Sequence, residues 1–119
     1  MKKSALIILN SAPFTGLKAQ EGLELLLSAP AFYQKVAVLF QADAVYQLLD
    51  LSAAENHGYK DFTAAYKAFD LYDIEKIYVN EEDLAMRGLT PQQLKIQAQL
   101  LNKSKTAQLQ LQYDIILKN

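Results

Sequence analysis

Short, continuous runs of apolar residues alternate along the chain with segments in which apolar residues recur every three or four positions. Runs of the first kind are typical of strands buried on both faces, and the second spacing is typical of helices with one buried face. The expected strands are 4–10, 35–41, 74–79, 94–100 and 113–117, and the expected helices are 17–29, 44–49, 61–71, 81–88 and 103–112. This order predicts an α/β fold of three layers, in which a mainly parallel sheet of about five strands carries helices on both faces.

Two of these segments rest on weaker patterns. Residues 94–100 alternate between apolar and polar, which favours a strand with one exposed face. Residues 103–112 are ambiguous between helix and strand, and a helix fits better between two strands. No linker, internal repeat or low-complexity segment interrupts the pattern, so residues 1–119 are expected to form a single domain.

Composition and charge narrow the class of protein. The chain is 51% hydrophobic and 21% charged, as globular proteins are. No apolar run approaches the roughly 18 residues of a membrane span. The run that follows Lys2 and Lys3 is too short for a signal peptide and lacks a good cleavage site, so a cytoplasmic protein is expected. The net charge is −1 and no strong Lys/Arg cluster stands out, which argues against direct binding of tRNA.

The chain contains no cysteine. It therefore has no disulfide, no thiolate zinc site and no thiol nucleophile. Because a persulfide forms only on a cysteine, the chain cannot itself carry sulfur in that form. No metal or cofactor is expected.

Other candidate chemistry is sparse. The loop at residues 10–16 contains one glycine and matches neither a dinucleotide-binding fingerprint nor a P-loop. The single histidine, His57, lies in an expected surface loop and is either a solvated residue or a general base. Asp43, Asp73 and Glu81 are placed to cap or flank helices, although paired acids could also act in hydrolysis or hold magnesium. No catalytic residue is predicted.

Aromatic residues form the most informative group. Tyr66, Phe69 and Tyr72 lie close together at the end of one expected helix, and Tyr78 follows on the next strand. The segment 42–51 also has a large apolar side. A domain of this length has limited interior, so part of this set belongs to the core and part is expected at an interface with other subunits. The interface candidates are Val45, Tyr46, Leu49, Phe69, Tyr72 and Tyr78.

Several stretches, in order and across nearly the whole chain, resemble the DsrE/DsrF-like family. They are residues 21–26, 42–49, 71–75, 87–89 and 113–117. The resemblance implies a DsrE-like α/β fold. It also implies a heterohexamer with TusB-like and TusD-like subunits.

The resemblance further implies a place in a sulfur relay. In such a relay the TusD-like subunit carries a persulfide, which it receives from a TusA-like donor and passes to a TusE-like acceptor for 2-thiolation of the tRNA wobble uridine. This chain is then expected to be a non-catalytic interaction subunit. One alternative is a DsrF-like subunit of a DsrEFH complex in sulfur oxidation. Another, from a different class, is a small ligand-binding or hydrolytic α/β domain that uses Asp43 and Asp73.

The sulfur-carrying relatives place their cysteine directly after the third strand, and the matching position here is Asn80. Asparagine cannot act as that nucleophile, and Glu81, Glu82 and Asp83 would raise the pKa of a neighbouring thiol. The loop is interpreted as a retained fold whose reactive site is gone. Asn80 is also a favoured residue type for capping the helix that follows it.

Overall fold

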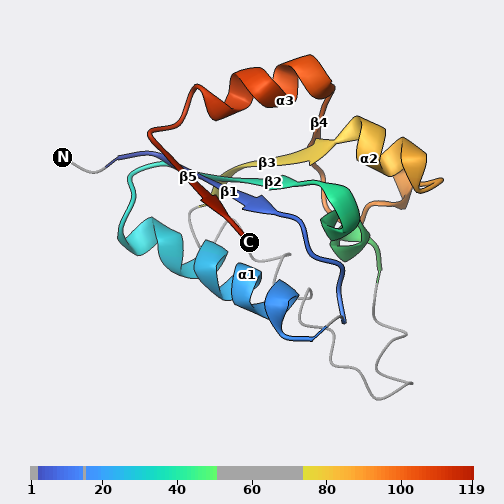
Figure 1. The fold of residues 1–119 in the computed structure, drawn as a ribbon, viewed down its shortest axis with the longest axis horizontal. Helices are drawn as coiled ribbons and strands as arrows, with labels where there is room; N and C mark the ends of the chain where they lie inside the picture. Colours follow the sequence, from blue (N-terminus) through green and yellow to red (C-terminus); the bar gives the residue numbers. More distant parts are fainter. Residues whose placement is uncertain (1–2, 15, 51–73) are drawn as a thin grey trace.

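The fold is a five-stranded sheet between helical layers, seen in a computed structural model that describes residues 3–14, 16–50 and 74–119 (Figure 1). The sheet has the order β4-β3-β2-β1-β5. Every neighbouring pair of strands is parallel. The strands are β1 (Ala5–Leu9), β2 (Val36–Phe40), β3 (Ile74–Asn80), β4 (Gln99–Leu101) and β5 (Ile115–Lys118).

Helices lie on both faces of this sheet. The helix α1 (Lys18–Ser28) covers one face and α3 (Lys103–Gln110) covers the other, while α2 (Glu81–Met86) follows β3 directly. Three short 3₁₀ helices complete the described elements: η1 (Ala29–Ala31), η2 (Ala42–Leu48) and η5 (Pro91–Gln93). The predicted α/β architecture with a parallel sheet and helices on both faces is confirmed. In the described ranges no helix is long and apolar enough to cross a membrane.

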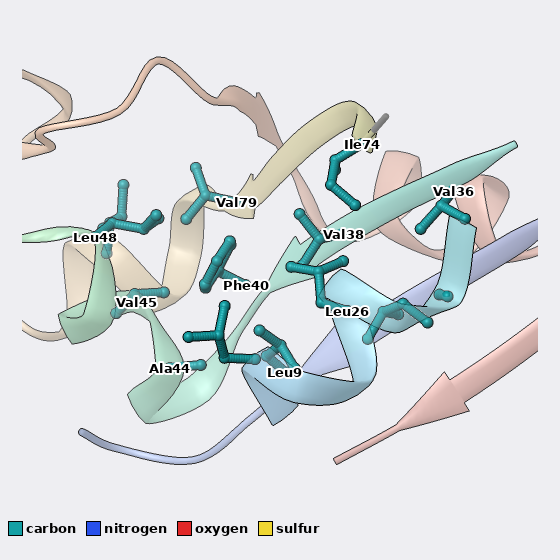
Figure 2. Packing of buried hydrophobic residues seen from close by; sticks show 14 residues of the cluster. Leu9, Leu26, Val36, Val38, Phe40, Ala44, Val45, Leu48, Ile74 and Val79 are labelled. Carbon is teal, nitrogen blue, oxygen red and sulfur yellow. The ribbon is translucent and has the colours of Figure 1, made fainter. Parts of the chain in front are cut away.

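The central strands are apolar throughout because both of their faces are covered. All five residues of β1 and all five of β2 are buried. Successive side chains of a strand point to opposite faces. Leu9, Val38 and Phe40 therefore pack with Leu26 of α1 (Figure 2). Leu6, Ile8 and Leu39 form a second cluster on the opposite face, together with Leu109 of α3.

The strand expected at 94–100 is largely wrong. The structure has a 3₁₀ turn at Pro91–Gln93 and a strand only at Gln99–Leu101. The apolar residues of this alternation do pack against the first core cluster: Leu94, Ile96, Ala98 and Leu100. The alternation therefore indicated correctly which side chains are buried, but not that the backbone forms a strand. The Lys95 N–H donates to the Leu48 carbonyl at 2.8 Å, which ties this segment to η2 instead of β3.

The remaining predictions differ in detail. The helix at 103–112 is confirmed as Lys103–Gln110, and the short helix at 44–49 is the 3₁₀ helix Ala42–Leu48. The helix expected at 61–71 lies outside the described residues.

Candidate functional site

The position expected to carry the remnant of a reactive site lies at the carboxyl edge of the sheet. Asn80 is the last residue of β3 and the N-cap of α2. Its side-chain oxygen accepts a hydrogen bond from the Asp83 N–H at 3.1 Å. This bond satisfies one of the helix's free N–H groups. The Asn80 side chain therefore caps α2 and holds a donor that could otherwise face an anionic group.

Asp83 joins α2 to the neighbouring turn. Its carboxylate accepts a hydrogen bond from the Ala42 N–H at 2.7 Å. Ala42 has a φ of 50°, in the left-handed region that costs energy for a residue with a side chain. The short bond to Asp83 holds this backbone in place at the end of β2.

A single arginine connects two of the carboxylates considered for chemistry. The Arg87 Nη2 lies 2.9 Å from Asp43 Oδ1, and its Nη1 lies 3.7 Å from Asp83 Oδ1. Asp43 is thus an ion-pair partner, and the other acid proposed with it, Asp73, lies outside the described residues. No group of three or more His, Cys, Asp or Glu side chains that could hold a metal was found among the described residues.

The loop after β1 is held by amide side chains. Gln47, which is buried, donates to the Ser11 carbonyl at 2.8 Å. Gln41 donates to the Asn10 side-chain oxygen at 2.8 Å, and Asn10 in turn donates to the Asn119 carbonyl at 3.3 Å. These bonds fasten the loop to η2 and to the end of β5. The polar groups of the loop at residues 10–16 thus hold the chain together at this edge of the sheet, and no nucleotide-binding role is needed to explain them.

An apolar depression of about 310 Å³ lies beside α2, and sequence reasoning missed it. Its lining includes Ala85, Leu89 and Leu100, with Glu81 and Glu82 on the same helix. Glu81 and Ala85 are four residues apart and share one face of α2, which was the available signal, whereas Leu89 lies beyond the end of the helix. The contribution of Leu100 could not be foreseen, because it depends on how β4 packs beside α2.

The predicted interface residues fall in three different environments. Val45 is fully buried and belongs to the first core cluster of this chain. Tyr78 is 8% exposed and packs in the second cluster. Tyr46 and Leu49 are half-buried and keep exposed area. Phe69 and Tyr72 lie outside the described residues, as does His57.

The family model described as DsrE/DsrF-like matches residues 3–118. The chain belongs to the DsrE/DsrF-like family. Within this family it is 39% identical over 103 residues to a Protein TusC homolog of Vibrio vulnificus, covering 87% of this chain and 85% of the relative. It is 34% identical over 119 residues to Protein TusC of Escherichia coli O157:H7, covering 99% of both.

A further family member and a solved structure extend the comparison. The intracellular sulfur oxidation protein DsrF of Allochromatium vinosum is 37% identical over 92 residues, covering 77% of this chain and 68% of that protein. The crystal structure of the ychN protein from E. coli matches with a TM-score of 0.77 at 17% identity, over 100% of both chains. That likeness shows a shared fold. The family model and the relatives named TusC confirm the resemblance to the DsrE/DsrF-like family.

Proposed function

We propose that this chain is a non-catalytic interaction subunit of a sulfur-relay complex that supports 2-thiolation of the tRNA wobble uridine. The proposal is supported by the similarity to proteins named TusC, which extends over most of the chain. Its partners would be TusB-like and TusD-like subunits in a cytoplasmic heterohexamer. The TusA-like donor and the TusE-like acceptor would meet the complex rather than this chain alone.

The observation that carries the non-catalytic role is the chemistry at Asn80. Relay of sulfur as a persulfide requires a thiol, and this chain has none. At the strand-to-helix junction the Asp83 N–H donates a hydrogen bond to the amide side chain of Asn80. In a sulfur-carrying subunit, an N–H at this position could instead donate to a thiolate and stabilise it. The fold is retained around a residue that is a structural cap.

The depression beside α2 supports an interaction role for the same edge. Its lining is mostly apolar, and the acidic residues Glu81 and Glu82 are among those that line it. A partner segment that offers an apolar side chain next to a lysine or arginine matches this surface in both shape and charge. Tyr46 of η2 and Leu49 directly after it add half-buried apolar area, and η2 contacts α2.

The test follows labelled sulfur through the assembled relay. A cysteine desulfurase and a TusA-like donor would be incubated with the complex, and each subunit would then be separated without reductant. We expect label on the TusD-like and TusE-like proteins and none on this chain. A complex whose TusD-like cysteine is replaced by serine is the control. Stable label on this chain would overturn the proposal.

A second candidate function is that of a DsrF-like subunit in sulfur oxidation, favoured by the similarity to the DsrF protein of Allochromatium vinosum. Deletion of the gene separates the two functions. Loss of thiolated tRNA supports the first, and loss of sulfur oxidation with normal tRNA supports the second. A ligand-binding or hydrolytic role for Asp43 is a weaker candidate, because Asp43 is already paired with Arg87.

A further inference from the structure

A second surface, on the α3 side of the sheet, has a different chemistry from the edge near Asn80. Two depressions, of about 430 Å³ and 240 Å³, share Tyr78 and Gln112 in their linings. They therefore adjoin, and we call them together the basic groove. Lys35 and Lys76 line the larger part, and Lys105 of α3 lines the smaller.

The register of the sheet explains why two of these lysines meet. Ala37 of β2 is paired with Lys76 of β3. Lys35 comes two residues before Ala37, so it lies on the same face of the sheet as Lys76. Tyr78, two residues after Lys76, shares that face as well. Lys35, which directly precedes β2, and Lys76 of β3 thus line one depression together with Tyr78.

The short helix α3 leaves this part of the sheet uncovered. It has eight residues, and its buried residues are Thr106 and Leu109. Leu109 packs with the second core cluster near β4, while the beginnings of β2 and β3 border the depression instead. The groove therefore forms because α3 is too short to cover the whole of this face of the sheet.

The charges around the groove are unbalanced. Its lining contains three lysines and, among the described residues, no carboxylate. Asp114 lies close by, but its carboxylate accepts hydrogen bonds from the N–H and the hydroxyl of Ser4, at 3.0 and 3.2 Å. The positive charge of Lys3 also acts on that carboxylate. The excess positive charge of the groove thus stays on Lys35, Lys76 and Lys105.

We propose that the basic groove binds a small molecule that carries a phosphate- or sulfate-type oxyanion, with Lys35 and Lys76 as its main ligands. Charge-assisted hydrogen bonds from ammonium groups are the interactions that such an anion prefers. The volume of the larger depression, about 430 Å³, falls in the range of small-ligand sites. Gln112 and Tyr78 offer further hydrogen bonds to the body of the molecule, with Lys105 at the far end.

A competing explanation exists for Lys76. The strand β4 pairs only with residues 78–80 of β3, so on that side Lys76 has no strand beside it within the described residues. Charged residues on exposed strand edges discourage edge-to-edge aggregation. This explanation predicts that removal of the Lys76 charge increases aggregation and leaves anion binding unchanged. It also gives no role to Lys35.

The test uses the purified chain of 119 residues at low ionic strength, labelled with ¹⁵N. Inorganic phosphate and adenosine monophosphate are titrated separately, to distinguish a free oxyanion from a phosphate ester. We expect shifts at the amides of Lys35, Lys76 and Gln112. The double variant Lys35→Gln/Lys76→Gln should bind about tenfold more weakly or worse. The variant Lys35→Arg/Lys76→Arg should retain binding.

The matched control is Lys18→Gln/Lys103→Gln, which removes the same charge from lysines that do not line the groove. It should bind as the unmodified chain does, and circular dichroism should show that all variants are folded. If the control variant lost as much affinity for the anion, the binding would depend on the net charge of the chain rather than on the groove, and the proposal would be overturned. Absence of shifts with both ligands, or binding of an RNA oligonucleotide through these lysines without either small ligand, would also overturn it.

Discussion

At the scale of single residues, Asn80 occupies the place where sulfur-carrying relatives are expected to hold a cysteine, and its side chain bonds to the Asp83 N–H. A cap of this kind is a property of local sequence, since the acceptor and the donor are three residues apart. It contributes to the stability of α2 without reference to any partner.

Replacement of Asn80 by alanine is therefore expected to destabilise the chain while sparing its function. Loss of an N-cap costs about 1 kcal/mol. Urea unfolding should show this decrease, whereas the thiolated fraction of tRNA should stay near normal in cells that assemble the complex. Asn80→Asp keeps an acceptor oxygen and is the matched control. A sharp loss of thiolation in Asn80→Ala, with the complex intact, would assign this position a part in sulfur transfer.

Gly22 lies where the packing of α1 leaves little room for a side chain. It is buried in α1, and an added Cβ would lie 2.6 Å from the Asn119 Oδ1 and 2.9 Å from Leu9 Cδ2. Glycine in a helix normally loses stability relative to alanine, by about 1 kcal/mol. Here an added methyl group would meet the side chains of Asn119 and Leu9, so we expect the preference to be reversed.

Gly22→Ala is expected to destabilise the chain by about 1–3 kcal/mol through overpacking. The measurement is chemical unfolding, with Glu24→Ala on the exposed side of the same helix as the control. A more stable Gly22→Ala variant would mean that Asn119 and Leu9 move aside without cost.

At the scale of elements, polar contacts join segments that are far apart in the sequence. Asp83 and Arg87 of the α2 region bind Ala42 and Asp43 at the start of η2. A comparable contact joins the beginning of β1 to the beginning of β5, where Asp114 binds Ser4. The Ile115 N–H also donates to the Ser4 carbonyl at 3.0 Å, which completes this junction.

The junction of β1 and β5 predicts a pH dependence. The Ser4 N–H chiefly, with the Ser4 hydroxyl and the charge of Lys3, lowers the pKa of Asp114 in the folded chain. A lowered folded-state pKa means that the stabilisation is present above the unfolded-state pKa and is lost as the pH falls through the folded-state value. Thermal unfolding should show a decline below about pH 4 that is smaller in Asp114→Asn. An unchanged decline in that variant would show that other carboxylates cause it.

At the scale of the whole molecule, two surfaces of the described fold have opposite character. The edge near α2 is apolar with two carboxylates, and the groove under α3 is polar with three lysines. Leu100 of β4 lines the first surface and its neighbour Leu101 lines the basic groove, so the two surfaces lie on opposite faces of the sheet. A partner at the first surface is therefore expected to leave Lys35 and Lys76 accessible.

Assembly should depend on the first surface. Tyr46→Ala removes a half-buried aromatic side chain, and a truncated interface anchor commonly costs about 2 kcal/mol of binding. Ala85→Lys places a positive charge in the apolar depression, opposite the expected basic partner. Both variants should weaken co-purification with a TusD-like subunit, whereas Leu17→Lys, at an exposed residue 67% accessible beside α1, should not. Normal co-purification of both would place the interface elsewhere.

Sequence alone determined much of this protein, because the information was local. Runs such as 4–10 and 35–41 are apolar at every position, and only a strand covered on both faces buries them all. The helices at 17–29 and 103–112 followed from spacing or from their place between strands. The absence of cysteine excluded a persulfide on this chain, whatever its fold.

Tertiary structure decided what depends on elements meeting at a distance. The alternation in 94–100 indicated burial correctly but not the backbone, since the Lys95 N–H bonds to η2 and leaves only three residues to pair with β3. Val45 proved to be core because η2 turns it inward, which no periodicity in a six-residue segment specifies. The presence of Lys35 and Lys76 in one groove required the register of β2 and β3, in which Ala37 pairs with Lys76, and register is set by the packing of the whole sheet.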